Sequence, residues 1–243
     1  METLSRQDLL TAAPRRLGDC VIPVLDLRDG RVVHANGGNR SAYPILKLEG
    51  YSAGEPLAVL DWLCMRYPFR SVYIADLDAL SDRPPQMEVL QALTRAQPDC
   101  RLHVDAPGQR PTLGIYPILA TERLVGDCMW TAQTNVKGGY WLSIDHRDQR
   151  LLGQLPSPEC LAGAHAVIDM NLNCVGKRMT ARERLARVHP TVRAESVKSR
   201  ILAGGIRTAD DIRAAWHAGF RAVLCGSALY SGTLDGAVLA EAL

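Results

Sequence analysis

Two aspartates hold matching places in a short pattern that the sequence contains twice. Asp26-Leu-Arg-Asp-Gly-Arg31 recurs as Asp145-His-Arg-Asp-Gln-Arg150, and each copy follows an apolar run and precedes two apolar residues. Two carboxylates on opposite sides of a substrate can divide acid–base work, because one can keep its proton while the other stays ionised. The pattern therefore predicts that Asp26 and Asp145 form a catalytic pair. The alternative is that each aspartate only caps the loop that follows it, where aspartate is common.

Two glycine-containing segments near the end of the chain predict a phosphate site. Ala203-Gly-Gly-Ile-Arg207 and Cys225-Gly-Ser-Ala228 each complete an apolar run. Glycine lets the backbone approach a ligand closely, and the N–H groups there and at the start of the next helix can bind a phosphate dianion. The expected phosphate-binding residues are Gly204, Gly205, Gly226 and Ser227. The alternative is that these glycines only permit tight turns.

The corresponding segments in the first half of the chain lack this chemistry. Gly204-Gly205 corresponds to Asp105-Ala-Pro-Gly108, and Gly226-Ser227 corresponds to Gly126-Asp127. Proline has no N–H to donate, and carboxylates repel a phosphate, so we expect no second phosphate here. Asp105 instead fits contact with an amine or hydroxyl, or a role as an extra acid or base. A substituted turn without a function is the alternative.

Two further carboxylates are candidate substrate contacts. Asp76 completes an apolar run and lies within Ala75-Asp-Leu-Asp78, and Asp169 completes another run. Asp76 equally fits a role in capping the loop that follows it.

Eight short apolar runs alternate with helical patterns and must position these side chains. Continuous apolar strands separated by helices indicate a parallel sheet that is buried on both faces, and eight such units predict an α/β fold of the (β/α)8 TIM-barrel class. An open doubly wound sheet is the alternative. In a barrel the carboxyl ends of the strands face the active-site mouth, and Asp26 and Asp145 then lie on opposite sides of it. The predicted strands are Val21–Asp26, Ser71–Asp76, Arg101–Asp105, Glu122–Gly126, Trp141–Asp145, Ala166–Asp169, Arg200–Gly204 and Ala222–Gly226.

The repeated pattern also predicts that the barrel consists of two half-barrel repeats. Arg101–Asp105 aligns with Arg200–Gly204, and 124–126 aligns loosely with 223–226. Together with the two aspartate patterns, these matches place strands one to four in register with strands five to eight. The predicted boundaries are 1–20 for an N-terminal extension and about 21–137 and 138–243 for the two half-barrels.

Two connecting segments have clear signals. Thr208 followed by Asp210 and Asp211 predicts the start of a helix that ends at Gly219. The long segment Gly37–Glu55 between the first two strands is a candidate lid, because loops of this length in compact domains are usually functional.

Composition excludes several classes of function. A net charge of +2 on 243 residues gives no field that favours nucleic acid or an anionic membrane. The seven cysteines contain no C-x-x-C pair, and His103, His146 and His165 show no metal-ligand spacing, so we expect no disulfide framework, metal or cofactor. With no signal-peptide or membrane-helix pattern, the sequence predicts a soluble, cytoplasmic protein.

At this point four motifs resemble the HisA/HisF family of histidine biosynthesis, and the resemblance extends from Cys20 onward. The motifs are Val21-Ile-Pro-Val-Leu-Asp-Leu-Arg-Asp-Gly-Arg-Val-Val33, Ala75-Asp-Leu-Asp-Ala79, Ala203-Gly-Gly-Ile-Arg207 and Cys225-Gly-Ser-Ala-Leu229. The family consists of (β/α)8 barrels, and its HisA branch (phosphoribosylformimino-5-aminoimidazole carboxamide ribotide isomerase) converts an N-glycosylamine aldose phosphate to a ketose by an Amadori rearrangement. The resemblance implies that Asp26 is the base that moves the C2 proton and that Asp145 is the acid that opens the ribose ring.

The sequence also departs from the family pattern. The family substrate carries a phosphate at each end, whereas only one glycine-rich phosphate site is predicted here. Ile168 stands where the isomerase presents a threonine, and the expected Asp-x-Asp-x-Asp-Gly stretch is Asp169-Met-Asn-Leu-Asn-Cys174. Such changes resemble those of diverged HisA-like paralogues, including ones assigned to one-carbon cofactor (methanofuran or tetrahydromethanopterin) biosynthesis.

Three hypotheses follow. The first is a HisA-like isomerase of a small phosphorylated metabolite. The second keeps the barrel and the phosphate but changes the reaction to an aldol, condensation or transfer step, with Asp105 as a third working carboxylate. The third is a catalytically silent barrel that binds a partner enzyme, as HisF binds a glutaminase, and assembly into a homo-oligomer is also open.

Overall fold

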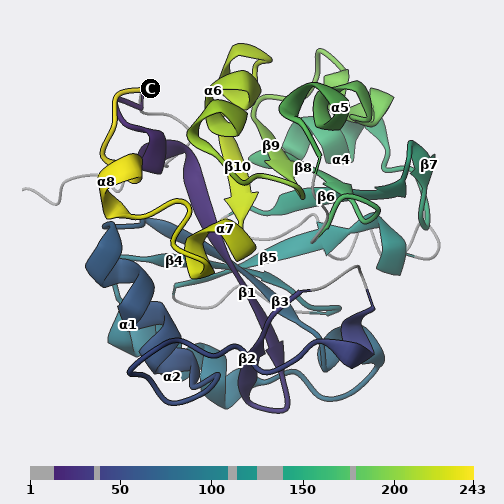
Figure 1. Cartoon of the computed structure of the whole chain (residues 1–243). Coiled ribbons are helices and arrows are strands. Elements are labelled where there is room, and N and C mark those ends of the chain that lie inside the picture. The colour runs from purple at the N-terminus through teal and green to yellow at the C-terminus, as the bar shows by residue number, and fades with distance from the viewer. Residues whose placement is uncertain (1–13, 36–38, 109–113, 125–138, 176–178) are drawn as a thin grey trace, which may run out of the picture.

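Eight parallel strands close into a barrel, which confirms the predicted fold class (Figure 1). The computed structural model describes residues 14–35, 39–108, 114–124, 139–175 and 179–243. Around the barrel the strands follow one another in chain order, and the pairing of the last strand with the first completes the circle. The barrel strands are β1 (Val21–Arg28), β3 (Ser71–Asp76), β4 (Arg101–Asp105), β5 (Ile115–Ala120), β6 (Trp141–Arg147), β8 (Ala166–Asn171), β9 (Arg200–Ala203) and β10 (Ala222–Cys225).

The predicted fourth strand was wrong. It was expected at Glu122–Gly126, but β5 lies earlier in the chain and Thr121–Arg123 form a turn of 3-10 helix. Pro117 hides this strand, because a proline is unusual in the centre of a sheet, yet here Pro117 is a register partner of Val104 in β4. Residues 125 and 126 lie outside the described part of the chain, as does Asp127. The alignment of 124–126 with 223–226 therefore has no strand to support it.

The repeated aspartate pattern forms the same local structure in both places. β1 and β6 continue past their aspartates and turn back as short antiparallel strands, β2 (Arg31–Val33) and β7 (Arg150–Leu151). Both residues of each turn have positive φ, at 51° and 72° for Asp29-Gly30 and 47° and 71° for Asp148-Gln149. This is the geometry that closes two-residue hairpins, so the pattern encodes a hairpin after each aspartate. The division of the whole barrel into two half-barrels stays a prediction.

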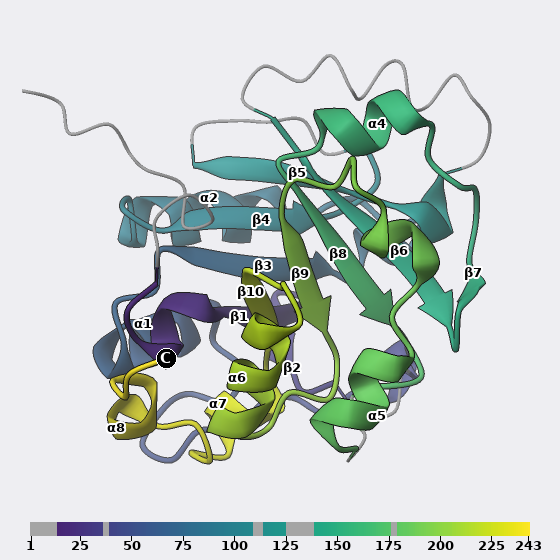
Figure 2. The same ribbon diagram turned by 90° about the horizontal axis from the view of Figure 1, so that it is seen from above.

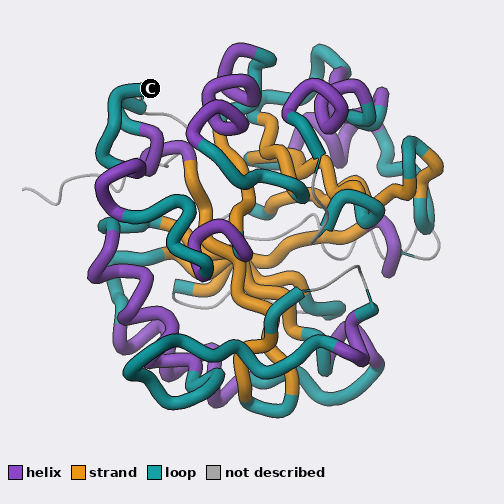
Figure 3. The backbone as a smooth tube through the Cα atoms, viewed as in Figure 1, coloured by secondary structure: helices purple, strands orange, loops and turns teal. Residues whose placement is uncertain are grey.

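Helices cover the outside of the barrel, with α1 and α2 on one flank and α4, α5 and α6 on another (Figures 1 and 2). Figure 3 shows the strands gathered at the centre and the helices around them. The predicted start at Thr208 is confirmed, because its hydroxyl accepts from the N–H of Asp211 while the Asp211 carboxylate accepts from the N–H of Thr208. The helices are α1 (Pro56–Arg66), α2 (Met87–Ala96), α4 (Pro158–Gly163), α5 (Ala181–Ala186), α6 (Ala209–His217), α7 (Ser227–Tyr230) and α8 (Gly236–Leu239).

Alternate residues of the strands build two separate apolar layers. Ile22, Ile168 and Leu224 belong to the cluster inside the barrel, whereas Leu25 and Val167 belong to the cluster between strands and helices. Asp26 shares the inward parity of Ile22 and therefore points into the barrel. Within the described ranges, no helix is long and apolar enough to cross a membrane.

Candidate active site

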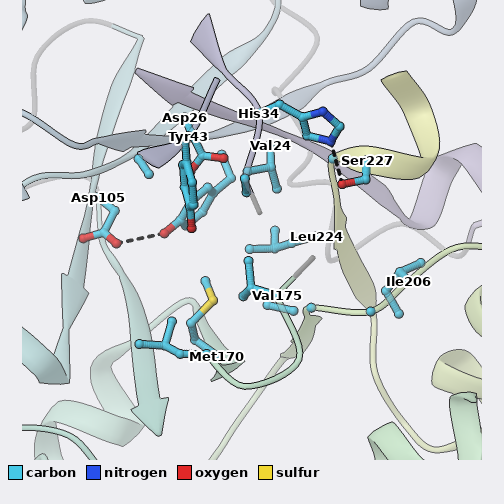
Figure 4. Close-up of a pocket in the computed structure, with 18 of the residues that line it drawn as sticks. Val24, Asp26, His34, Tyr43, Asp105, Met170, Val175, Ile206, Leu224 and Ser227 are labelled. Carbon is cyan, nitrogen blue, oxygen red and sulfur yellow. Dashed lines mark hydrogen bonds between the residues drawn. The ribbon is translucent and has the colours of Figure 1, made fainter. Parts of the chain in front are cut away.

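A cavity opens at the carboxyl ends of the barrel strands, where the chemistry of such barrels is found. Asp26 and Asp105 lie on one side of it and Ser227 with His34 on the other, with Val24 and Leu224 between them (Figure 4). Asp145 lines the same cavity from β6, which is opposite β1 in the closed barrel. The structure thus brings the predicted aspartate pair together in one enclosed space.

The Asp26 carboxylate faces the cavity without a hydrogen-bond partner among the described residues. Burial is the main cause that raises its pKa, to about 7. The guanidinium of Arg40 opposes this shift, while the negative charge of Asp105 adds to it. Asp26 therefore exchanges a proton near neutral pH, which a general base requires.

Asp145 lies deeper, with 2% of its surface exposed. Its carboxylate accepts hydrogen bonds from the Ser143 hydroxyl at 2.9 Å and from the Thr121 hydroxyl and the Glu122 N–H at 3.2 Å. These donors favour the ionised form, but burial together with the charges of Glu122 and Asp105 raises the pKa of Asp145 well above its usual value. Asp145 therefore holds its proton more firmly than an ordinary aspartate.

Asp105 adds a third carboxylate to the cavity. One carboxylate oxygen, Oδ2, accepts a hydrogen bond of 2.8 Å from the hydroxyl of Tyr73. Burial raises the pKa of Asp105 to about 6, with Tyr73 and Arg40 working against the shift and Glu122 adding to it. Three aspartates with raised pKa values therefore share one cavity.

The predicted phosphate-binding residues line the opposite side. Gly204 and Gly205 have φ of 84° and 79°, which glycine adopts without strain. Arg207 also lines this rim, and the hydroxyl of Ser227 lies 2.9 Å from Nε2 of His34. Burial, followed by the charge of Arg207, lowers the pKa of His34. We call this side of the cavity, formed by Gly204, Gly205, Gly226 and Ser227, the glycine rim.

The candidate lid, as far as it is described, is held to β1 by Arg28. The Arg28 guanidinium donates to the carbonyls of Arg40 and Ser41 at 2.9 Å and of Tyr43 at 2.8 Å. The Arg40 side chain reaches across to Glu122, at 2.6 Å. Arg40 and Tyr43 consequently line the cavity. Gly37 and Gly38 are outside the described residues.

Two other predicted contacts, Asp76 and Asp169, do not line the cavity. The Asp76 carboxylate accepts from the N–H groups of Asp78, Ala79 and Gln86 and so holds the loop after β3. Asp169 points to the outside of the barrel, where it accepts from the Arg184 guanidinium at 2.5 Å and from Nε2 of His146 at 3.1 Å. Both side chains are placed to support loops around the site.

Several residues of the site were not predicted from the sequence. Arg40 and Tyr43 belong to the segment that was predicted only to be a lid. Glu122 was assigned to a strand, and Thr121, directly before it, was not predicted to have a role. His34 carried no signal of its own. Across the described residues no group of three or more histidine, cysteine, aspartate or glutamate side chains could hold a metal ion.

Comparison with known proteins relates most of the chain to isomerases of one name and to an uncharacterized protein. A 1-(5-phosphoribosyl)-5-((5-phosphoribosylamino)methylideneamino) imidazole-4-carboxamide isomerase of Myxococcus xanthus is 28% identical over 250 residues, covering 90% of this chain and 97% of its own length. The isomerase of the same name from Thermococcus kodakarensis is 24% identical over 226 residues, covering 88% of this chain and 93% of its own. An uncharacterized protein of Methanocaldococcus jannaschii is 23% identical over 223 residues, covering 88% and 95%.

No protein-family model matches the chain. The similarity nevertheless runs end to end in each of these relatives, and the eight-stranded parallel barrel agrees with the fold that the sequence motifs imply. The chain is therefore a HisA-like barrel protein, a distant full-length relative of the imidazole-4-carboxamide isomerases.

Proposed function

We propose that this protein is an isomerase that converts the aldose form of a small phosphorylated, sugar-type metabolite to the ketose form. The observation that carries the proposal is the single cavity that Asp26 and Asp145 enter from opposite strands, with the glycine rim on its other side. The names of the relatives support the reaction class, because they describe isomerases of a compound with phosphoribosyl groups.

The two aspartates differ in the way that the reaction needs. Asp145 keeps its proton and acts as the acid, donating it to the ring oxygen of an N-glycosylamine so that the bond between that oxygen and C1 breaks. Asp26, with its pKa raised to about 7, acts as the base and takes the proton from C2 of the opened sugar. The resulting enol becomes the ketose when a proton is added at C1. Two carboxylates whose surroundings set different pKa values are a recurrent solution for such chemistry.

The glycine rim binds the phosphate of the substrate in this proposal. Its backbone lies open to the cavity, because Gly204 and Gly205 have no side chains between the peptide groups and a ligand. The loops after the seventh and eighth strands of (β/α)8 barrels frequently bind phosphate. A bound phosphate holds C1 and C2 of the sugar between the two aspartates. Holding the reacting atoms in this position lowers the entropic part of the activation barrier.

The test is substitution of each aspartate by asparagine, which keeps the shape and removes the titrating group. With an N-glycosylamine of ribose 5-phosphate in D2O, the wild-type protein should exchange the C2 proton for deuterium. Asp26→Asn and Asp145→Asn should each slow this exchange by about 10²–10⁴-fold. Asp61→Asn, an exposed change on α1, is the matched control and should exchange at the wild-type rate. Wild-type exchange in both cavity variants would sink the proposed mechanism.

Two observations favour a second candidate, an aldol, condensation or transfer reaction on a different phosphorylated substrate. Asp105 places a third carboxylate in the cavity, and Ile168, buried inside the barrel, offers no hydrogen bond. Expression in a histidine auxotroph that lacks the isomerase distinguishes the two candidates. Growth would support the isomerase, whereas failure to grow, together with no C2 exchange on any sugar phosphate, would favour the second candidate.

A further inference from the structure

The two sides of the cavity present different chemical groups, carboxylates on one and glycine backbone on the other. This difference indicates that the two ends of the substrate also differ. Asp26, Asp105 and Asp145 come from the first, third and fifth barrel strands, and we call this part of the cavity the acidic side; the glycine rim follows the seventh and eighth strands. Figure 4 shows Asp26 and Asp105 across the cavity from Ser227. A ligand that spans the cavity therefore meets anion-binding backbone at one end and carboxylates at the other. The inference rests on the function proposed above, because it takes the glycine rim to be the phosphate site.

The acidic side has one cavity-lining cation among the described residues, and that cation is already engaged. The Arg40 guanidinium lies 2.6 Å from Oε1 of Glu122, so its charge is balanced before any aspartate is counted. A second phosphate at this side would face three carboxylates, and like charges a few ångströms apart repel strongly in a buried site. A substrate with a phosphate at each end therefore does not suit the cavity.

Asp105 has an acceptor oxygen that the protein leaves open to a ligand. The side chain is buried, with 4% of the residue exposed, and it lines the cavity. Its Oδ2 accepts from Tyr73, but Oδ1 accepts no hydrogen bond from any described residue. The Asp26 carboxylate is also without a donor in the described part of the chain. Buried acceptors of this kind are expensive unless a ligand or water donates to them.

We propose that the substrate is a monophosphate whose other end carries a protonated amine or a similar cationic nitrogen group, which donates hydrogen bonds to Asp105 and Asp26. An ammonium group has three donors and no acceptor, which matches a set of open carboxylate oxygens. It also supplies positive charge beyond that of Arg40, the one cation that the described residues place on the acidic side, and charge-assisted hydrogen bonds are the stronger kind. A neutral hydroxyl would fill the donor requirement but leave the charge uncompensated.

The binding of such a group should release protons. Burial raises the pKa of Asp105 to about 6 and of Asp26 to about 7, so both hold part of their protons at a pH between these values. A nearby cation favours the ionised carboxylates and expels those protons. Calorimetry in two buffers of different ionisation enthalpy measures the release directly.

The decisive experiment compares three ligand series of matched chain length, namely n-alkyl phosphates, ω-aminoalkyl phosphates and α,ω-bisphosphates, by titration calorimetry on the full-length protein. At the best chain length, the aminoalkyl phosphate should bind at least about tenfold more tightly than the alkyl phosphate. Asp105→Asn should reduce this preference several-fold, because the neutral amide no longer attracts the ammonium group while its oxygen can still accept from Tyr73. Asp61→Asn should change neither affinity.

Each other outcome has a definite meaning. Equal affinity for the alkyl and aminoalkyl series at every length, or tightest binding by the bisphosphates, would overturn the inference while the phosphate site stands. Absence of binding by all three series would overturn the phosphate site and this inference together.

Discussion

The turn after β9 and the turn after β4 occupy comparable places at the barrel mouth but present different groups to the ligand. After β9, Gly204 and Gly205 expose backbone, and after β4, Asp105 presents a carboxylate and Pro107 removes an N–H. One turn therefore offers peptide groups and the other a side chain. The difference shows that equivalent turns of one barrel can bind chemically different ends of a ligand.

The two turns also differ in how they are held. Behind the glycine rim, the buried Arg184 guanidinium donates to the carbonyl of Ala203 at 2.6 Å and, through Nε, to that of Gly204 at 3.2 Å. The same guanidinium binds the Asp169 carboxylate at 2.5 Å. Burial alone would raise the pKa of Asp169, but the hydrogen bond from His146 and the charge of Arg184 hold it below its usual value. A buried ion pair thus fixes the rim, whereas Asp105 is fixed by one tyrosine hydroxyl.

The largest predicted effect comes from removing the support of the glycine rim. Arg184→Met removes the cation that pairs with the buried Asp169 carboxylate and the donor to three carbonyls, those of Asp169, Ala203 and Gly204, so the free energy of unfolding should fall by about 3–5 kcal/mol. Urea unfolding measures the change. Arg182→Met, an exposed change on the same helix, is the control and should stay within about 0.5 kcal/mol of wild type. Equal stability of the two variants would show that the ion pair does not hold the rim.

Removal of the Asp105 carboxylate should have the opposite effect and raise the free energy of unfolding at neutral to basic pH. Burial raises the pKa of Asp105 to about 6, so the folded protein keeps a proton that the unfolded chain loses near pH 4. The stability linked to this proton is complete below about pH 4 and is lost as the pH rises through about 6. Asparagine does not ionise, so Asp105→Asn should not lose stability as the pH rises. The variant should therefore be more stable than wild type by about 2 kcal/mol at pH 8.

The pH profile is what tests this prediction. The gain in the free energy of unfolding should be nearly constant above about pH 7 and should shrink as the pH falls from about 6 toward 4, with Asp61→Asn as a control that shows no such trend. A difference that stays constant with pH would mean that Asp105 acts through packing and not through its charge.

Local patterns were sufficient to predict most of the barrel. Seven of the eight strands follow from apolar runs, because parallel strands buried on both faces have continuous apolar sequences. The aspartate pattern also placed Asp26 and Asp145 at the mouth, although its physical basis is the hairpin at Asp29-Gly30 and Asp148-Gln149. The fourth strand failed at Pro117, where pairing to both neighbours prevails over the usual avoidance of proline.

Contacts between segments far apart in the chain could not be predicted from local sequence patterns. Arg40 and Glu122 are 82 positions apart, and nothing local to either residue signals their ion pair. Asp169 was predicted to contact the substrate, but it does not line the cavity. Its inward or outward direction depends on the parity of β8, and its partner Arg184 comes from a helix that follows the strand. The surroundings that raise the aspartate pKa values likewise exist only after the chain has folded.

The smallest predicted change in stability comes from replacing one glycine in each turn by alanine. Gly205 and Gly108 have φ of 79° and 72°, so alanine at either position should cost about 1 kcal/mol of unfolding free energy. An added Cβ meets nothing within 4 Å at Gly108, and at Gly205 its nearest neighbour is Cγ of Met179 at 3.4 Å, an ordinary contact. Only Gly205 lines the cavity, so only Gly205→Ala should weaken alkyl phosphate binding, by about tenfold. Because the two variants share the backbone strain, an equal loss of phosphate affinity in both would mean that the strain, and not the glycine rim, controls binding.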